Sequence, residues 1–183
     1  SDGQAIAATL TRGLTAEYLL FRLHPLSASE TIIVHAAAGG TGVIMCQWAK
    51  SLGATVIGTV GDESKFSTAL ANGCDHVVCH NDQDFVEKIT ALTDGKLVDV
   101  VYDSIGKDTF ELSLQCLKPR GLMVAYVNSS GKPVPIEVLN LARIGSLYLT
   151  RRILSHCIST RREYVAGTKR YFAALQSKVI TLP

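Results

Sequence analysis

One segment constrains the fold of this chain more than any other: a β-branched run, residues 31–36, followed at once by a glycine-rich turn and a helical run. The turn meets the spacing GxGxxG at Ala37, Gly39 and Gly42, with alanine in the first place. In a strand-turn-helix unit, the second position lets the backbone approach a pyrophosphate, and the third allows close packing of helix on strand. Free N–H groups at the helix start then bind anionic oxygens, so the segment predicts a dinucleotide site. The alternative is a tight turn that binds nothing.

The same alternation of strand-like and helix-like runs continues along the chain. Strands are predicted at 31–36, 55–60, 76–79, 97–103, 122–127 and 146–150. Helices are predicted at 42–52, 64–72, 82–93 and 108–117. The first three of these helices end at Gly53, Gly73 and near Gly95, because glycine adopts a positive φ at little cost. Right-handed crossovers then predict an α/β fold, a doubly wound six-stranded parallel sheet in the order 3-2-1-4-5-6.

Two segments lie outside this alternation. Residues 1–24 are predicted to form a leading helical segment that is interrupted near Gly13, and residues 159–177 a long terminal helix. With 183 residues, the chain is close to the size of one domain of about 150 residues. We therefore expect a single domain over 1–183, with its sheet core at 31–151.

Composition excludes several classes of protein. The net charge is +2 with basic and acidic residues interspersed, which argues against a dedicated nucleic-acid binder. The 5 cysteines show no CxxC spacing, so neither a disulfide framework nor a metal site is expected, and reduced thiols favour the cytoplasm. No apolar run approaches the roughly 20 residues of a membrane span.

The end of the second predicted strand bears on the choice of nucleotide. NAD-selective folds usually place an acidic residue there to hold the ribose 2′-OH, whereas this strand ends in Val60. Ser64 and Lys65, just beyond, offer a donor and a positive charge that favour the 2′-phosphate of NADPH. Asp62 and Glu63 would repel that phosphate if they pointed inward, and Lys65 could instead be a solvated lysine at a helix start.

Three long runs carry a family likeness: AAAGGTGVIMCQWAKSLGATVIGTVG, VVYDSIGKDTFELSLQCLKPRGLMVAYVNSSG and GSLYLTR. With them the chain resembles the zeta-crystallin-like quinone oxidoreductases of the medium-chain dehydrogenase/reductase superfamily. The resemblance implies an excised Rossmann domain for NADPH, whose GroES-like catalytic domain is absent from this sequence. It implies zinc-independent hydride transfer from NADPH to a small quinone.

The resemblance also assigns cofactor-binding residues. It places the phosphate loop on Ala38, Gly39, Gly40, Thr41 and Gly42. It places the adenosine phosphate on Gly61, Ser64 and Lys65, with His80 where the family has a tyrosine beside the 2′-phosphate. It places the nicotinamide half near Thr15, Ser104, Ile105, Asn128 and Ser129. No residue is assigned to catalysis; Asp103 is expected to cap a loop, and Cys46 and Trp48 to pack in the core.

Other functions stay open. An NADPH-dependent enone or enoyl reductase of the same superfamily would have nearly the same nucleotide domain. From another class, the resemblance allows a zeta-crystallin-like RNA-binding or structural protein. The residues for an RNA surface would be Arg151, Arg152, Arg161, Arg162, Tyr164, Lys169, Arg170 and Tyr171.

The last predicted strand, 146–150, bears on assembly. It is apolar and lies at the edge of the predicted sheet, and an exposed edge is a template for pairing with another chain. A homodimer through this strand is therefore expected, unless the terminal helix covers the edge.

Overall fold

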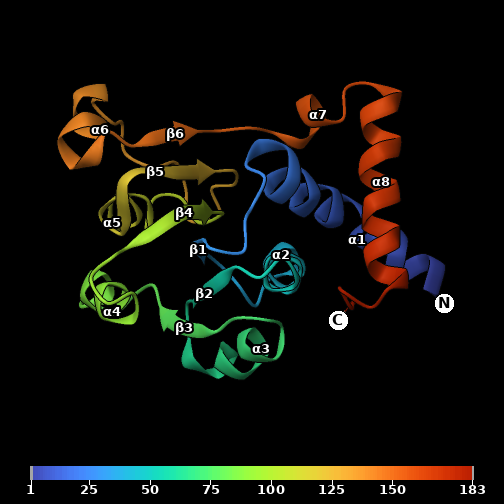
Figure 1. Cartoon of the computed structure of the whole chain (residues 1–183), viewed down its shortest axis with the longest axis horizontal. Coiled ribbons are helices and arrows are strands. Elements are labelled where there is room, and N and C mark those ends of the chain that lie inside the picture. Colours follow the sequence, from blue (N-terminus) through green and yellow to red (C-terminus); the bar gives the residue numbers. More distant parts are fainter. Residues whose placement is uncertain (1, 183) are drawn as a thin grey trace.

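The computed structural model describes residues 2–182, and side chains from residue 9 onward. Its centre is a six-stranded sheet in the order β3-β2-β1-β4-β5-β6 (Figure 1). Every pair of neighbouring strands is parallel. The fold class and strand order predicted from the sequence are therefore confirmed. The limits of the predicted domain at residues 1 and 183 lie outside the described residues.

The elements have the following bounds. The strands are β1 (Thr31–Val34), β2 (Thr55–Val60), β3 (His76–Cys79), β4 (Val98–Asp103), β5 (Leu117–Ala125) and β6 (Tyr148–Thr150). The α-helices are α1 (Asp2–Glu17), α2 (Gly40–Ser51), α3 (Phe66–Ala71), α4 (Phe85–Leu92), α5 (Phe110–Gln115), α6 (Val138–Gly145), α7 (Leu154–Cys157) and α8 (Arg161–Gln176). A π-helix η1 (Tyr18–Leu23) follows α1, and a 3-10 turn η2 (Glu63–Lys65) precedes α3.

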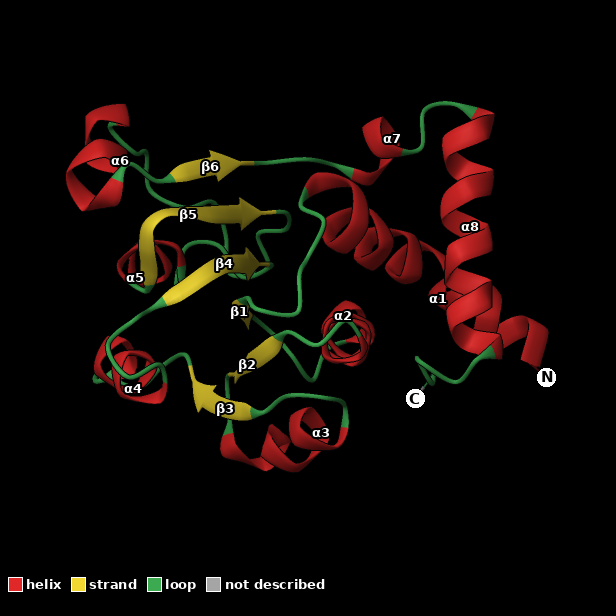
Figure 2. Cartoon of the chain, in the orientation of Figure 1, coloured by secondary structure: helices red, strands yellow, loops and turns green. Residues whose placement is uncertain are grey.

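Both faces of the sheet are buried, as Figure 2 shows by the helices on either side. Along β1, Ile32 and Val34 point to one hydrophobic cluster, which α1, α2 and α8 complete. Ile33, between them, points to a second cluster, which α4 and α5 complete. This period of two explains why β1 is a continuous apolar run: neither of its faces meets water.

The predicted interruption near Gly13 is wrong. Helix α1 runs through Gly13, and the change to π-helical geometry comes at Tyr18. A Cβ on Gly13 would lie 2.2 Å from Cε2 of Tyr171, whose hydroxyl is 2.8 Å from Oγ1 of Thr9. Glycine at this position therefore serves the close approach of α1 and α8 and does not break the helix.

Other helices and strands differ from the sequence prediction in their boundaries, for local reasons. Strand β5 begins at Leu117, where the sequence predicted the end of a helix, and Pro119 and Gly121 lie within the strand. Helices α6 and α7 were not predicted. The predicted strand 146–150 is shorter, because Ser146 takes a left-handed conformation (φ 54°) at the end of α6.

The end of the sheet at β6 is open. Strand β6 pairs with β5, and α8 packs on α1 instead of covering β6 (Figure 1). The edge strand is thus available, as the dimer expectation requires. Within residues 2–182, no helix combines the length and the apolar character needed to cross a bilayer.

Candidate functional site

A groove of about 350 Å³ lies beyond the carboxyl ends of the strands, where doubly wound folds bind ligands. We name it the glycine-loop groove. It is lined by Ala36, Ala38, Gly39, Val60, Gly61, Lys65, His80, Ile105, Asp108, Ser129 and Ser130. Seven of the predicted cofactor residues are among these: Ala38, Gly39, Gly61, Lys65, His80, Ile105 and Ser129. The structure thus brings together both halves of the site predicted from the sequence.

The glycine-rich turn forms one wall of the groove. The N–H of Gly39 donates to the carbonyl of Ala36 (2.8 Å), and α2 begins at the next residue. A Cβ on Gly42 would lie 2.2 Å from that same carbonyl oxygen, so this position requires glycine for the helix to pack on the turn. The first N–H groups of α2, including those of Gly40 and Thr41, lack intrahelical acceptors and are oriented for an anion.

A cation that sequence reasoning missed lies beside this turn. A Cβ on Gly40 would lie 2.5 Å from Nη1 of Arg12, so the guanidinium of α1 rests on the start of α2. No local pattern could have indicated this contact, because it depends on how α1 packs against the sheet.

The far wall carries the residues predicted to hold the adenosine phosphate. The N–H of Ser64 donates to Oδ1 of Asp62 (2.8 Å). Hydrogen bonds from Ser64, together with the charge of Lys65, lower the pKa of the Asp62 carboxyl. Asp62 is therefore an anion that caps its own turn. Ser64 itself is exposed and does not line the groove, whereas the exposed Lys65 does.

His80 closes this wall. Burial lowers the pKa of its imidazole, so the ring is neutral near pH 7. Its Nδ1 is buried and has no hydrogen-bond partner among the described residues. A Cβ on Gly61 would lie 3.3 Å from Cε1 of the ring, so the backbone passes close to it. His80 and Lys65 both line the groove, so the two side chains border the place that a phosphate in it would occupy.

A buried histidine lies beneath the groove. His35 Nδ1 is 2.7 Å from Oγ1 of Thr59, and His35 Nε2 is 2.8 Å from Oγ of Ser113. The Ser113 hydroxyl donates to the carbonyl of Thr109 (2.7 Å), so it accepts from His35, which therefore carries its proton on Nε2. Burial, and to a lesser extent His80, lowers the pKa of His35 to about 3. The ring centroids of the two histidines are 6.4 Å apart.

The loops after β4 and β5 form the floor at the other end. Asp103 is fully buried and accepts from the N–H groups of Ile105 (2.7 Å) and Gly106 (3.1 Å). Its carboxylate also accepts from the hydroxyl of Thr109 (3.0 Å). Burial raises the pKa of Asp103, and these donors oppose that shift. The side chain thus caps the loop, as expected, and does not face the groove.

Three residues expected near the nicotinamide half do not line the groove. Thr15 lies in α1, where its hydroxyl donates to the carbonyl of Thr11 (2.8 Å). Ser104 Oγ is 3.4 Å from the carbonyl of His35. Asn128 Oδ1 accepts from Arg151 (2.9 Å). Ser130 and Asp108, which the sequence did not indicate, line the groove instead.

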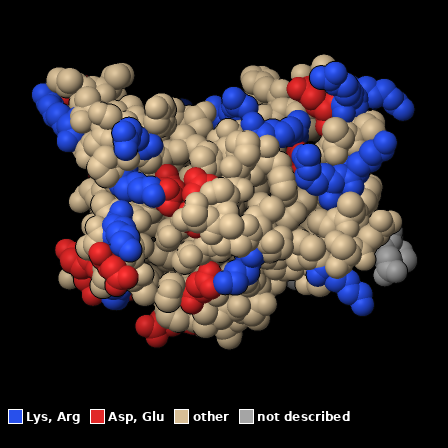
Figure 3. Space-filling view, viewed as in Figure 1, with Lys and Arg blue, Asp and Glu red and all other residues tan. Residues whose placement is uncertain are grey.

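The proposed RNA surface is only partly present. Figure 3 shows acidic and basic side chains interspersed over the visible face, with basic ones gathered above α7 and α8. Tyr171 is fully buried, and Arg170 forms an ion pair with the buried Glu17, so neither is free to stack on bases. Cys46 and Trp48 are buried core residues.

No metal-binding cluster is found within the described part of the chain: no group of three or more His, Cys, Asp or Glu side chains there could hold an ion. The described residues therefore offer no set of ligands for a zinc ion.

The family of zinc-binding dehydrogenases matches residues 40–170. A 2-haloacrylate reductase from Burkholderia sp. is 47% identical over 98% of this chain and 54% of its own length. The structure of Escherichia coli quinone oxidoreductase complexed with NADPH is 46% identical, with a TM-score of 0.90, over 93% of this chain and 52% of that one. CurK enoyl reductase is 27% identical, with a TM-score of 0.83, over 97% of this chain and 53% of that one. The chain thus spans about half the length of these relatives.

Proposed function

The chain belongs to the zinc-binding dehydrogenase family, within the medium-chain dehydrogenase/reductase superfamily, and from this premise we propose that it is the NADPH-binding domain of a reductase. The observation that carries the proposal is the glycine-loop groove, in which the turn before α2, Lys65 and His80 line one cavity. A relative of about twice its length binds NADPH in its solved structure.

We assign the cofactor to the groove as follows. The N–H groups around Gly39 and Gly40 hold the pyrophosphate, with Arg12 adding positive charge. Lys65 and His80 hold the 2′-phosphate, and Ser64 contributes from the rim. The loops at 104–106 and 128–130 border the nicotinamide half; they are joined by a bridge between Gly106 and Gly131. Asp103 and His35 keep these loops and the turn in position from below.

The nicotinamide, when bound, supplies a hydride. The chain's own residues orient the cofactor and exclude water from one side of it. Quinones accept hydride without a strong acid, so a zinc-independent quinone reductase is the activity that we propose for the whole protein. The GroES-like catalytic domain, outside this sequence, would form the other wall of the substrate pocket.

A second candidate is reduction of an activated alkene. It is favoured by the identity of 47% to a 2-haloacrylate reductase and by the similarity to an enoyl reductase. Both reactions use the same hydride donor, and the nucleotide domain alone serves either one. The discriminating residues would face the acceptor and not the cofactor.

We also propose a homodimer through β6 and a cytoplasmic location. Strand β6 is an open edge, and Tyr148 on it is 62% exposed. Pairing with a second copy would extend the sheet across a two-fold axis. The cysteines are free, four of them buried, which fits a reducing compartment.

The test of cofactor choice is a calorimetric titration of the chain with NADPH and with NADH, repeated for Lys65→Ala. Loss of a charge-assisted contact to the 2′-phosphate should weaken NADPH roughly tenfold and leave NADH unchanged. Lys169→Ala removes an exposed lysine from α8, away from the groove, and is the matched control. An equal loss of affinity for both nucleotides, or the same loss in the control, would show that Lys65 does not bind the 2′-phosphate.

A further inference from the structure

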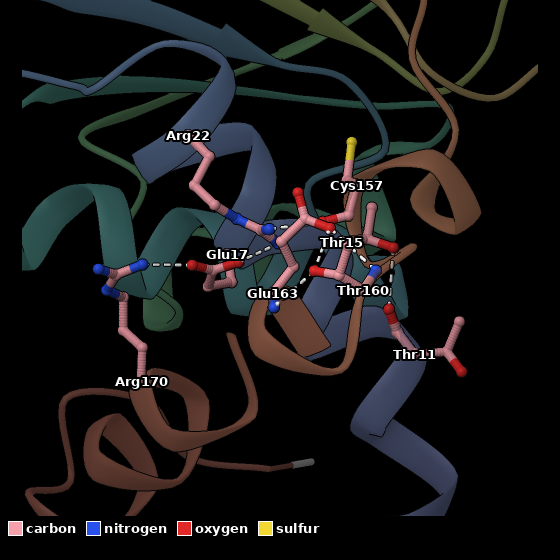
Figure 4. Close-up of polar contacts among 8 residues, drawn as sticks. All are labelled: Thr11, Thr15, Glu17, Arg22, Cys157, Thr160, Glu163 and Arg170. Atoms are coloured by element: carbon pink, nitrogen blue, oxygen red, sulfur yellow. Dashed lines mark hydrogen bonds and ion pairs between the residues drawn. The ribbon is translucent and has the colours of Figure 1, made fainter. Parts of the chain in front are cut away.

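A second cavity, of about 430 Å³, lies where η1, the segment after β6, α7 and the start of α8 meet. We name it the arginine pocket. Its lining consists of Arg22, Arg151, Arg152, His156, Cys157 and Glu163. Every one of these side chains is ionisable, and none belongs to the glycine-loop groove. Figure 4 draws the polar contacts around Arg22, Cys157 and Glu163.

Arg22 is fixed by its neighbours. Its Nη1 donates to the carbonyl of Cys157 (2.5 Å), and its Nη2 lies 2.6 Å from Oε2 of Glu17. Glu17 is fully buried and also pairs with Arg170 (Figure 4). Arg22 and Arg170 thus share one buried carboxylate, which fixes Arg22 as a rigid wall of the pocket.

Glu163 is fixed as well. Its carboxylate accepts from the N–H (3.0 Å) and the hydroxyl (2.8 Å) of Thr160, in a capping box at the start of α8. These hydrogen bonds, with one from Ser159 and the charge of Arg22, lower the pKa of Glu163. The carboxylate thus satisfies the helix start, although it still contributes negative charge to the pocket.

Arg152 is different. Its carbonyl accepts from the hydroxyl of Tyr18 (3.3 Å), which holds the backbone, but its guanidinium has no carboxylate partner among the described residues. The thiol of Cys157 is its neighbour. Arg151 has no carboxylate partner there either, so two exposed guanidiniums of the pocket lack a matching anion within the described part of the chain. The fork of a guanidinium matches the two oxygens of a planar carboxylate, so these arginines favour an anionic group over a neutral one.

Arg151 connects this pocket to the proposed cofactor site. Its Nη1 donates to Oδ1 of Asn128 (2.9 Å), and the next residue, Ser129, lines the glycine-loop groove. The arginine pocket therefore lies at the same edge of the sheet, next to the loop assigned to the nicotinamide half.

We propose that the arginine pocket binds the carboxylate of an acidic substrate, with Arg152 as the residue that recognises it. This inference rests on the second candidate function, reduction of an activated alkene, because the bound acid is a substrate only if the protein has that activity. The carboxylate pairs with Arg152, and His156 lies within the same pocket as a further hydrogen-bonding group. An α,β-unsaturated carboxylic acid is the class of molecule that this arrangement favours over a neutral quinone.

Direct binding tests the proposal without turnover. The chain is titrated by NMR with acrylate, with neutral acrylamide of similar shape, and with inorganic phosphate. Acrylate should bind and acrylamide should not, and Arg152→Gln should weaken acrylate roughly tenfold. Arg161→Gln removes an exposed arginine outside the pocket and should leave acrylate binding unchanged. Arg152→Lys keeps the charge but loses the fork, so it should restore only part of the affinity.

Three results would overturn the proposal. Equal binding of acrylate and acrylamide would show that the negative charge of the ligand does not contribute to binding. An equal loss of acrylate affinity in the Arg152 and Arg161 variants would show that acrylate does not bind in the arginine pocket. Phosphate binding more tightly than acrylate, with the same dependence on Arg152, would assign the pocket to a phosphate instead. Each variant is also titrated with NADPH: failure of NADPH binding in the unaltered chain would contradict the proposed function separately from the pocket.

Discussion

Acid should destabilise this domain through His35, and the size of the effect can be worked from its surroundings. The pKa of His35 falls from 6.5 to about 3 in the folded chain, chiefly because the ring is buried. Below pH 6.5 the imidazole of His35 therefore binds a proton in the unfolded chain but not in the folded chain. Stability falls as pH falls wherever the unfolded state binds more protons, at about 1.4 kcal/mol per pH unit. Between pH 7 and pH 5, the free energy of unfolding should therefore fall by about 2 kcal/mol because of His35.

The variant that isolates this contribution is His35→Gln, which keeps a polar side chain but does not titrate. Urea unfolding is followed by the fluorescence of Trp48, the one tryptophan of the sequence and a buried residue. Between pH 7 and pH 5, the free energy of unfolding should fall by about 2 kcal/mol more in the unaltered chain than in the variant. Burial also lowers the pKa of His80, but His80 is present in both proteins and cancels in the difference.

The reasoning would be refuted by stability curves that run parallel for the two proteins over this range. Such a result would mean that His35 accepts a proton in the folded state. The Thr59 hydroxyl, which donates to Nδ1 of the neutral ring, would then have to turn so that it accepts from Nδ1, and the network beneath the groove would be looser than the distances indicate.

Three further predictions concern the turn, the loop and the edge. Gly42→Ala places a Cβ 2.2 Å from the Ala36 carbonyl and should cost about 3 kcal/mol in urea unfolding; Gly40→Ala, which meets only the flexible Arg12 side chain, should cost far less. Asp103→Ala leaves the two buried N–H groups of Ile105 and Gly106 without an acceptor and the Thr109 hydroxyl with only the Gly106 carbonyl (3.4 Å); it should lower the free energy of unfolding by about 3–5 kcal/mol. Leu149→Pro should give monomers in sedimentation while Trp48 stays buried; a dimer that persists would exclude β6 as the interface.

The sheet was predictable because its signals are local. Each strand is a short β-branched run, and the three predicted glycine ends have positive φ: Gly53 at 86°, Gly73 at 98° and Gly95 at 76°. Given the alternation, the handedness of crossovers left few possible orders. The phosphate turn was predictable for the same reason, since its spacing lies within one strand-turn-helix unit.

Features made by distant residues were not predictable. Gly13 was read as a helix breaker because its partner, Tyr171, lies in the last helix. His35 was passed over, since Thr59 and Ser113 reach it from separate elements. Helix α6 is a short helix after a proline-containing loop, and none of its residues is buried. For Gly13 and His35 the packing of elements, and not the local pattern, decides the structure.

The most direct test of the central claim is to locate NADPH on the chain by backbone NMR. If the glycine-loop groove is the cofactor site, NADPH should shift the amide signals of Gly39, Gly61 and Ser129, and NADH should shift Gly39 and Ser129 with a smaller effect near Lys65. Signals from α6, on the far side of the sheet, should not move with either nucleotide. Saturable shifts that avoid the groove, or that are the same for both nucleotides around Lys65, would contradict the account.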